Sequence, residues 1–159
     1  MAVNRGPPPA RATSVRTTAV WRVTSRTSDL VSLVTHAIFA EHVPAQLTGI
    51  EDVEQALREM RKSCRGRLIV TRGDRGACVL DGARFHHEPA FPVIPVDTTG
   101  AGDVFRGGFI FALLQGQPIE RALRTANAAA AVSCTRLGAL NGVPTLDEVL
   151  LLMEANVQP

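Results

Sequence analysis

Hydrophobic and polar positions follow two different patterns along this 159-residue chain. Residues 1–28 are rich in Arg, Thr, Ser and Pro, and their apolar residues have no sustained period, which predicts a disordered or poorly packed basic extension. A targeting peptide and a nucleic-acid-binding arm are alternative interpretations of this segment. Residues 29–155 alternate short apolar runs with amphipathic segments, which predicts a single α/β domain.

Short apolar runs bounded by turn residues predict the strands, and helical spacing of apolar residues predicts the helices. The predicted strands are Asp29–Val34, Arg67–Thr71, Ala77–Leu80, Arg84–His87 and Phe91–Val96, the last an edge or irregular segment because of its two prolines. The predicted helices are Ala37–Leu47 with a break or kink at Pro44, Glu51–Lys62, Gly102–Gln115, Pro118 to Gly138, and a last one from the capping box Thr145–Glu148. Because Gly102–Gln115 is apolar on nearly all sides, we expect it to be buried.

Composition and charge exclude several classes of function. With 45% apolar residues and no apolar run long enough to span a bilayer, the chain is expected to be neither wholly disordered nor transmembrane. Lys62 is the only lysine and lies in no Gly-rich loop, which rules out a P-loop nucleotide site. Residues 29–159 carry twelve basic and fifteen acidic residues, the reverse of a nucleic-acid-binding domain. The three cysteines form no C-x-x-C pair, so we expect reduced thiols in a cytoplasmic protein.

The segment that carries candidate chemistry is Val96–Gly108, V-D-T-T-G-A-G-D-V-F-R-G-G. Gly100 and Gly102 stand where an extended segment turns into a helix, so backbone amides there can approach an anion closely. Asp103 follows in the first helical turn. Because a carboxylate repels a bound phosphate, Asp103 suits the role of a base for a hydroxyl that attacks the phosphate. Taken alone, the same residue is consistent with an ordinary helix cap.

The full string D-T-T-G-A-G-D-x-F-x-x-G closely resembles the C-terminal signature of the ribokinase-like (PfkB) carbohydrate kinases. The resemblance implies a three-layer αβα fold and ATP-dependent phosphoryl transfer to a sugar hydroxyl, with Mg²⁺ bridging the phosphates. It assigns Asp103 as the catalytic base, and Gly100, Ala101 and Gly102 as the anion hole over the transferring phosphate. The implied partners are ATP and a small sugar, with no nucleic acid and no membrane.

Other segments resemble the family in order and spacing. The loop T-R-G-D-R-G, with Thr71, Gly73 and Gly76, resembles the family's ATP-contacting loop, although taken alone it is a plain β-turn. Asn127 resembles the Asn beside the adenine, although taken alone it fits a helix–helix hydrogen bond. Many members bind a monovalent cation such as K⁺, and the matching positions are Asp97, Thr99, Ser133, Arg136, Gly138 and Gly142.

The resemblance covers roughly residues 29–154, so we expect a partial domain without the family's N-terminal substrate half and lid. The family's N-x-x-E motif, linked to magnesium and phosphate, should lie near Ala37–Val43, where only Glu41 is present. These departures predict a truncated kinase that is weak or inactive alone. The alternative is a non-catalytic nucleotide-binding module or subunit. An exposed sheet edge favours self-association into a homo-oligomer, and Arg106 faces either the acceptor or the solvent.

Overall fold

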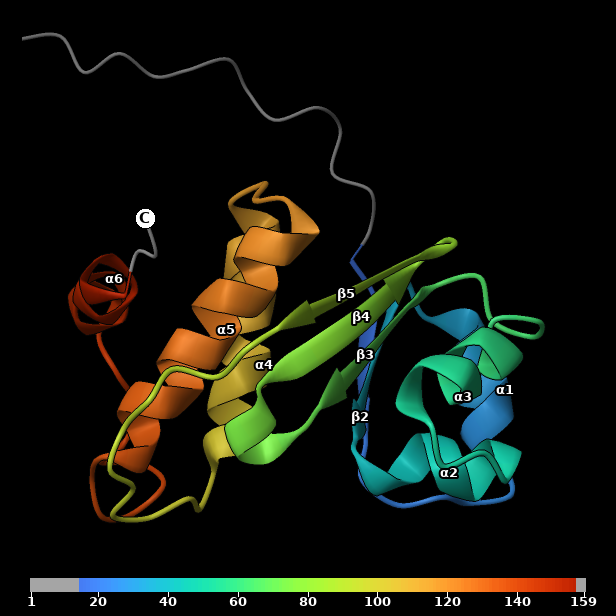
Figure 1. The fold of residues 1–159 in the computed structure, drawn as a ribbon, viewed down its shortest axis with the longest axis horizontal. Coiled ribbons are helices and arrows are strands. Elements are labelled where there is room, and N and C mark those ends of the chain that lie inside the picture. The colour runs from blue at the N-terminus through green and yellow to red at the C-terminus, as the bar shows by residue number, and fades with distance from the viewer. Residues whose placement is uncertain (1–14, 157–159) are drawn as a thin grey trace, which may run out of the picture.

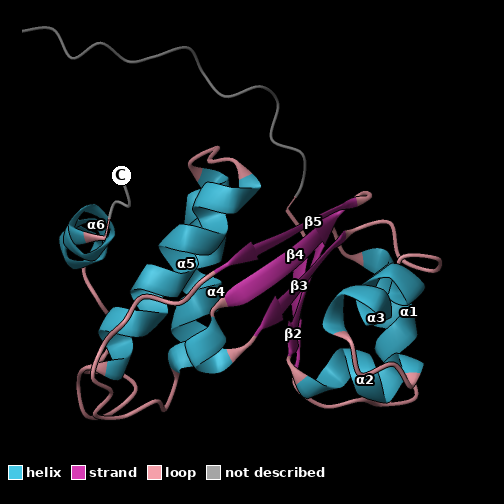
Figure 2. Ribbon diagram, viewed as in Figure 1, coloured by secondary structure: helices cyan, strands magenta, loops and turns pink. Residues whose placement is uncertain are grey.

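A computed structural model of the protein describes residues 15–156. Residues 1–14, which belong to the predicted extension, lie outside the described part. The strands of this part form one five-stranded sheet. Figures 1 and 2 show the sheet between two groups of helices. This is the three-layer αβα arrangement that the resemblance implies. Within residues 15–156, no helix has the length and apolar character that crossing a membrane requires.

One mixed sheet forms the middle layer. Its strands, in spatial order, are β1 (Thr17–Val20), β2 (His36–Ala40), β3 (Arg67–Thr71), β4 (Ala77–Asp81) and β5 (Arg84–Glu88). The first three strands are parallel to one another, whereas β4 and β5 pair antiparallel with their neighbours. The carboxyl ends of the parallel strands therefore meet at one edge, and ligands of open α/β sheets bind at such an edge.

Helices cover both faces of this sheet. One face carries α1 (Thr27–Leu33), α2 (His42–Thr48) and α3 (Val53–Met60), and the other carries α4 (Ala101–Leu114) and α5 (Ile119–Cys134). The last helix, α6 (Leu146–Ala155), packs on α5 at the outside of the molecule (Figure 1). A short 3-10 turn, Gly73–Arg75, joins β3 to β4.

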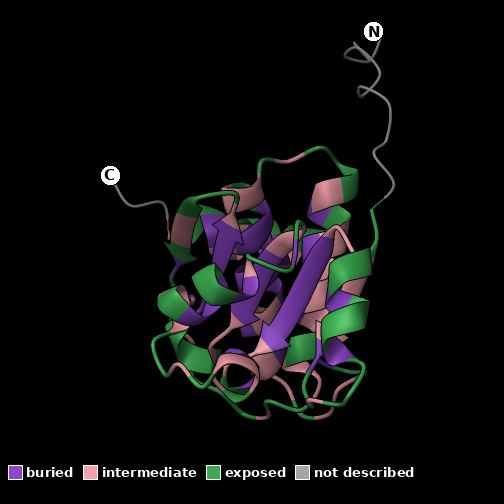
Figure 3. Cartoon of the chain, turned by 90° about the vertical axis from the view of Figure 1, so that its right-hand side faces the viewer, coloured by how far each residue is buried: buried purple, intermediate pink, exposed green. Residues whose placement is uncertain are grey.

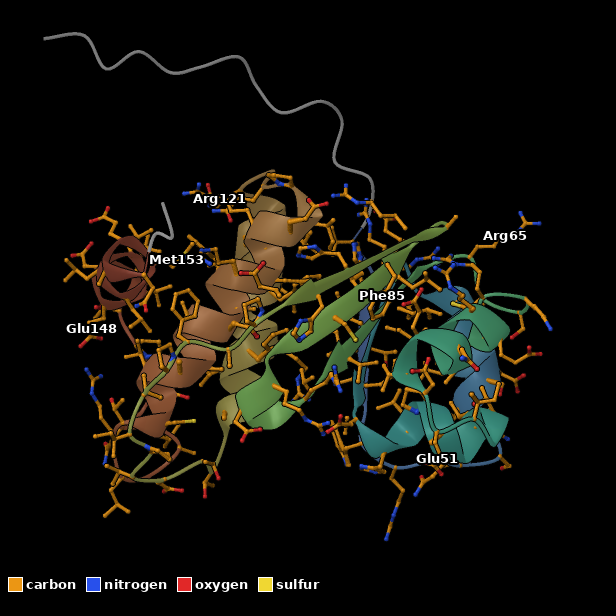
Figure 4. All side chains as sticks on the ribbon, viewed as in Figure 1. Glu51, Arg65, Phe85, Arg121, Glu148 and Met153 are labelled. Atoms are coloured by element: carbon orange, nitrogen blue, oxygen red, sulfur yellow. The ribbon has the colours of Figure 1, made fainter. Side chains whose placement is uncertain are left out.

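The core lies on both sides of the sheet because alternate strand residues point to opposite faces. Phe39 and Val70 pack with α1–α3, whereas Ile38 and Ile69 pack against α4 and α5. All four side chains are buried, and the strands form the central buried region in Figure 3. The partly buried Phe85 of β5 packs on the α1–α3 side, as Figure 4 shows. Covering on both faces explains why the inner strands are continuous apolar runs.

The chain before residue 36 departs from the sequence prediction. Thr17–Val20, predicted to belong to a poorly packed extension, forms β1 and pairs in parallel with β2. Asp29–Val34, predicted as a strand, lies mostly within helix α1, where Thr27 and Val31 are buried one helical turn apart. Both predictions fail for the same reason. These segments are short, and packing against β2 and the core decides their structure more than their own pattern does.

Two predicted elements after residue 36 also differ. Ala37–Leu47, predicted as one helix, divides into strand β2 and helix α2. Pro44 lies in the first turn of α2, where its missing N–H costs nothing because the first helical amides have no partner within the helix. Phe91–Val96 forms a loop rather than a strand. Its two prolines remove amides that a sheet would need.

The remaining predictions of secondary structure are confirmed with small differences at their ends. Strands β3, β4 and β5 and helices α3, α4, α5 and α6 lie where the apolar pattern places them. The capping box is formed: Thr145 accepts from the Glu148 amide, and the Glu148 side chain accepts from the Thr145 amide. Helix α4 is less buried than its composition predicts, since Phe111 and Leu114 are exposed.

Candidate functional site

The signature segment lies at the carboxyl edge of the parallel strands. Gly100 is the N-cap of α4, and its φ of 81° belongs to the left-handed region that favours glycine. A Cβ built on Gly100 would lie 2.8 Å from the Ala139 Cβ, so both the conformation and the packing require glycine here. The tight turn therefore follows from one residue without a side chain. It starts a fourteen-residue helix, whose first amides have no partner in a preceding helical turn.

The amides of this turn are only partly used by the protein. Ala101 donates to the Thr98 carbonyl at 3.2 Å and Asp103 donates to the Gly100 carbonyl at 2.9 Å. The Gly102 amide has no hydrogen-bond partner among residues 15–156, and a Cβ at Gly102 would meet no atom within 4 Å. An amide at a helix start beside open space is suited to an anion.

Asp103 points into the open on the same helical turn. Its side chain is 75% exposed and forms an ion pair with Arg106, one turn further along α4. Asp103 and Gly100 also line a cavity of about 450 Å³, which we call the apolar cavity because its walls are mostly hydrocarbon. The carboxylate is therefore accessible to a second reactant from outside the helix.

A second cavity lies on the other side of the turn. This glycine cleft has a volume of about 610 Å³ and is lined by Ala101 and Gly102. The four residues predicted to contact the nucleotide also line it: Thr71, Gly73, Gly76 and Asn127. Residues from β3, the β3–β4 turn, α4 and α5 thus converge on one space. The start of α4 lies between this cleft and the apolar cavity, with the Asp103 carboxylate on the far side from the cleft.

The predicted nucleotide residues differ in what else they do. A Cβ on Gly76 would lie 2.2 Å from the Glu88 carbonyl oxygen, so this glycine lets the turn pass under the end of β5. Asn127 is buried, and its Nδ2 donates to the carbonyls of Glu88 and Pro89, each at 3.0 Å. Asn127 thereby holds the segment after β5 against α5. The alternative interpretation of Asn127 was a hydrogen bond between two helices. The observed hydrogen bonds also join two chain segments, but they join α5 to the end of β5 and the loop after it rather than to a second helix.

Sequence reasoning missed much of the cleft wall. Phe91 is buried there, with the Arg124 guanidinium 4.9 Å above its ring. The other lining residues that it missed are Asp74, Ala90, Pro92, Val93, Pro95, Thr98, Phe105, Ala130, Ala131 and Cys134. The available signal was the F-P-V segment and the run of alanines in α5, because small or rigid residues leave room for a flat ligand.

The predicted cation residues lie in the loop before α4, at the end of α5 and in the loop after it, and Asp97 joins the two loops. One Asp97 oxygen accepts from the Thr99 amide at 2.8 Å, and the other accepts from the Gly138 amide at 2.9 Å. These hydrogen bonds lower the pKa of Asp97, and the one from Thr99 has the largest effect. Two backbone carbonyl oxygens, those of Ser133 and Gly138, converge on Gly142. A Cβ built on Gly142 would lie 2.8 Å from the Ser133 oxygen and 3.2 Å from the Gly138 oxygen.

Arg136 and Thr99 differ in exposure and partner. Arg136 pairs with Glu148 of α6, and this side-chain contact lowers the pKa of Glu148 to about 2. Thr99 is exposed and contributes its amide to Asp97. The structure thus brings the predicted set into one neighbourhood, in which Asp97, Ser133 and Gly138 present oxygen atoms.

The end of β2, where the family's N-x-x-E motif is expected, carries Glu41 in contact with two arginines. Glu41 accepts from Arg72 Nε at 3.0 Å and from Arg75 Nη2 at 2.5 Å. Its carboxylate is therefore neutralised by the β3–β4 turn. Within residues 15–156, no group of three acidic, His or Cys side chains is arranged to hold a metal ion.

Comparison with known proteins identifies the fold. Residues 13–146 match the family model described as the pfkB family carbohydrate kinase. The chain belongs to the pfkB family. Its curated relatives include Bacillus subtilis ribokinase, 48% identical over 83 residues, or 52% of this chain and 28% of the relative. Fructokinase-1 of Oryza sativa subsp. japonica is 37% identical over 118 residues, or 69% of this chain and 36% of the relative.

Solved pfkB-family structures have the same arrangement. Thermotoga maritima ribokinase superposes with a TM-score of 0.81 at 30% identity, over 91% of this chain and 50% of that one. Arabidopsis thaliana ribokinase, solved with ribose and ATP, gives 0.80 at 28% identity, over 87% of this chain and 47% of that one. The chain thus spans about a third of its curated relatives and half of these solved chains. The predicted ribokinase-like fold and its partial extent are confirmed.

Proposed function

We propose that this pfkB-family chain carries the nucleotide and base side of an ATP-dependent sugar kinase. The observation that supports it most is the turn Gly100–Gly102, which lies between the glycine cleft and the exposed Asp103 carboxylate. A phosphate held by this turn would have the nucleotide on one side and a base on the other. Phosphoryl transfer needs this in-line placement of donor and acceptor.

Each part of the turn has a defined task. The Gly102 amide and the start of α4 stabilise the charge on the transferring phosphate, because amides fixed by a helix need no reorganisation. Asp103 accepts the proton of the acceptor hydroxyl as the new bond to phosphorus forms. Thr71, Gly73, Gly76 and Asn127 shape the cleft for the nucleotide. The ribose and ATP of the Arabidopsis ribokinase structure make a pentose and ATP the first ligands to test.

Magnesium fits this site as an ion that arrives with the nucleotide. Mg²⁺ is commonly held by one or two carboxylates together with substrate phosphates and water. Asp74, which lines the glycine cleft, and Asp103, in the first turn of α4, are the carboxylates beside this site. The bound ion would neutralise phosphate charge. The convergent Ser133 and Gly138 carbonyls with Asp97 suit a monovalent cation such as K⁺, because their donors are all oxygen.

The test is turnover and nucleotide binding by the 159-residue chain and its Asp103→Asn variant. We expect ATP to bind both proteins with the same affinity in calorimetry. Sugar-dependent ADP formation, assayed with ribose, fructose, ribose 5-phosphate and gluconate, should fall about 10²–10⁴-fold in the variant because the general base is lost. Asp147→Asn, which changes another exposed acid in the first turn of a helix, is the matched control and should keep full turnover.

The outcomes separate the proposal from its alternative. ATP binding without sugar-dependent turnover in the unmodified chain would favour a non-catalytic nucleotide-binding module. Full turnover in Asp103→Asn would refute the role of the base, and absence of ATP binding would refute the glycine cleft as the nucleotide site.

A further inference from the structure

Arg106 has a more specific environment than a solvent-facing arginine. It lies one helical turn after Asp103 on α4, so the two side chains share a face and form an ion pair. On its other side, the Arg106 guanidinium lies 5.3 Å from the ring centroid of Trp21. Trp21 directly follows β1 at the carboxyl edge of the sheet. Arg106 and Trp21, from two distant segments, therefore form one cluster with the proposed base.

Burial makes this guanidinium depend on a negative partner. Its side chain is only 26% exposed, and burial lowers the pKa of Arg106. A partly buried cation is costly unless an anion compensates it. Within residues 15–156, Asp103 is the only acidic group that pairs with Arg106. The Asp103 carboxylate is thus already paired with Arg106 before any substrate is bound.

Most donors of Arg106 are free for a ligand. Arginine carries five N–H donors in a planar fork, and the structure uses Nη2 for Asp103. The other N–H groups have no hydrogen-bond partner in the described part of the chain, and none of them is buried without a partner. They therefore reach solvent. A planar fork of this kind fits a carboxylate or a phosphate in a bidentate way.

The two sides of Asp103 differ in polarity. The apolar cavity beside it is lined largely by hydrocarbon side chains, including Val104, Phe111, Leu140 and Val143, which offer nothing to sugar hydroxyls. The opposite side offers the Arg106 donors and the ring of Trp21, which is 65% exposed. An exposed indole ring can cover the C–H face of a sugar. A polar acceptor is therefore expected on the Arg106 side.

We propose that Arg106 and Trp21 form a subsite for an anionic group on the acceptor. The acceptor class is then a sugar phosphate or a sugar acid rather than a neutral sugar. This proposal rests on the proposed function, because it takes Asp103 as the base. The acceptor's anion shares the Arg106 guanidinium and loosens its hold on Asp103. The ion pair then serves to keep the base inactive until a charged acceptor arrives.

The reaction balances without another reactant. The acceptor hydroxyl loses its proton to Asp103 while its oxygen forms a bond to the γ-phosphorus of ATP. The bond from that phosphorus to the β-γ bridging oxygen breaks, and ADP leaves with the electron pair. The proton passes from Asp103 to solvent when the phosphorylated product departs.

Trp21 provides a direct readout because it is the only tryptophan of the chain. We would titrate the 159-residue protein with ribose 5-phosphate, gluconate, ribose, inorganic phosphate and ATP, and record tryptophan fluorescence. We expect saturable changes with ribose 5-phosphate or gluconate at concentrations at least tenfold below those needed for ribose or inorganic phosphate. ATP affinity is measured separately by calorimetry.

Variants of Arg106 show whether its guanidinium donors cause the preference for anionic sugars. Arg106→Gln should weaken binding of the anionic sugar about 10–100-fold, the usual value of a charge-assisted contact, while ATP affinity stays unchanged. Arg106→Lys should restore part of the affinity, because the charge remains and the fork is lost. Arg121→Gln, on the exposed side of α5 (Figure 4), is the control and should change neither ligand. A melting curve for each variant confirms that it is folded.

Three results would overturn the proposal. Equal affinity for ribose and ribose 5-phosphate would remove the anionic selectivity, and equal affinity for inorganic phosphate and ribose 5-phosphate would show a general anion site. Loss of ATP affinity in Arg106→Gln would assign Arg106 to the nucleotide instead. If anionic sugars bind through Arg106 but ATP does not bind at all, the subsite stands and the kinase function fails.

Discussion

The two edges of the parallel strands use their polar groups in opposite ways. At the amino edge, His36 is buried, and the Arg67 Nη1 donates to its Nε2 at 3.2 Å. Arg67 in turn pairs with Asp81 at 2.9 Å, so polar groups of β2, β3 and β4 hold one another. At the carboxyl edge, the Gly102 amide and the Asp103 carboxylate face open cavities. One edge is closed by internal contacts, and the other is left open to ligands.

The difference shows how one sheet separates stability from function. Groups at the amino edge are hydrogen-bonded to one another around the buried His36, so changing them alters the free energy of unfolding. Groups at the carboxyl edge have unused hydrogen-bonding capacity, so changing them alters ligand binding. The exceptions are glycines such as Gly76, which line the cleft and also allow the backbone to pass. The following predictions test this separation.

The largest effect is expected for Gly76→Ala. The new Cβ would lie 2.2 Å from the Glu88 carbonyl oxygen, and the residue has a φ of 81°. Strain and overlap together should lower the free energy of unfolding by about 2–5 kcal/mol. Gly73→Ala is the matched control, because its φ is 60° but a Cβ would meet nothing within 4 Å. Gly73→Ala should lower the free energy of unfolding by only about 1–2 kcal/mol.

Urea unfolding of the two variants measures this difference. Equal destabilisation would show that overlap with the end of β5 is unimportant, and the cleft wall at Gly76 would then not be fixed by packing.

Acid should destabilise the protein through the amino edge. Burial, and then the charge of Arg67, lowers the pKa of His36 from 6.5 to about 4. The unfolded chain binds this proton more tightly than the folded one. The contribution of His36 to stability is therefore constant above about pH 6.5 and falls as the pH drops toward 4, by about 3 kcal/mol in total.

Thermal unfolding at a series of pH values measures the contribution of His36. His36→Gln should flatten the curve in this window. His42→Gln, an exposed histidine at the carboxyl edge, should leave the curve unchanged. An equal flattening by both variants would contradict the contrast between the two edges.

A single methyl group at the carboxyl edge should reduce binding without reducing stability. Gly102→Ala adds a Cβ that meets no protein atom within 4 Å but projects beside the unpartnered amide. ATP affinity should fall about tenfold to hundredfold, the value of about one or two lost charge-assisted hydrogen bonds. The free energy of unfolding should stay the same or rise by up to about 1 kcal/mol, since alanine suits a helix better than glycine. Unchanged ATP affinity in calorimetry would exclude this turn as the phosphate site.

The smallest effect is expected for Glu41→Gln. It breaks the pairs with Arg72 and Arg75, which are partly exposed and worth less than about 1 kcal/mol. ATP affinity should change less than about twofold, because neither arginine lines the glycine cleft. A clear gain in ATP affinity would place the freed arginines on the phosphates and extend the cleft to the end of β2.

The sequence predicted the second half of the fold better than the first. From Glu51 onward, the amphipathic pattern of α3, the apolar runs of β3 and β4 and the capping box at Thr145 indicate their elements directly. Before that point, Thr17–Val20 has the same local pattern as the extension preceding it. Its pairing with β2 makes it a strand. The helix α1 depends in the same way on Val31 reaching the core.

The candidate site shows the same division. The glycine turn and Asp103 were predicted from a contiguous string, because a tight turn, a helix start and an acid in its first turn are local features. Phe91 and Ala130 belong to the F-P-V segment and the alanine run, which do not by themselves show where these residues lie, and Trp21 had no local signal. Their positions in the site depend on how the segment after β5, helix α5 and the end of β1 pack around α4.

By itself, the sequence determined where α4 starts, which residues in its first turn carry amides and a carboxylate, and that the fold is α/β. These properties depend on local backbone geometry and on the period of apolar residues. Only the tertiary structure decided that the glycine turn lies between two cavities and that Arg106 rests on Trp21 while pairing with Asp103. Such contacts join residues far apart in sequence, and no local preference encodes a partner that packing alone brings near.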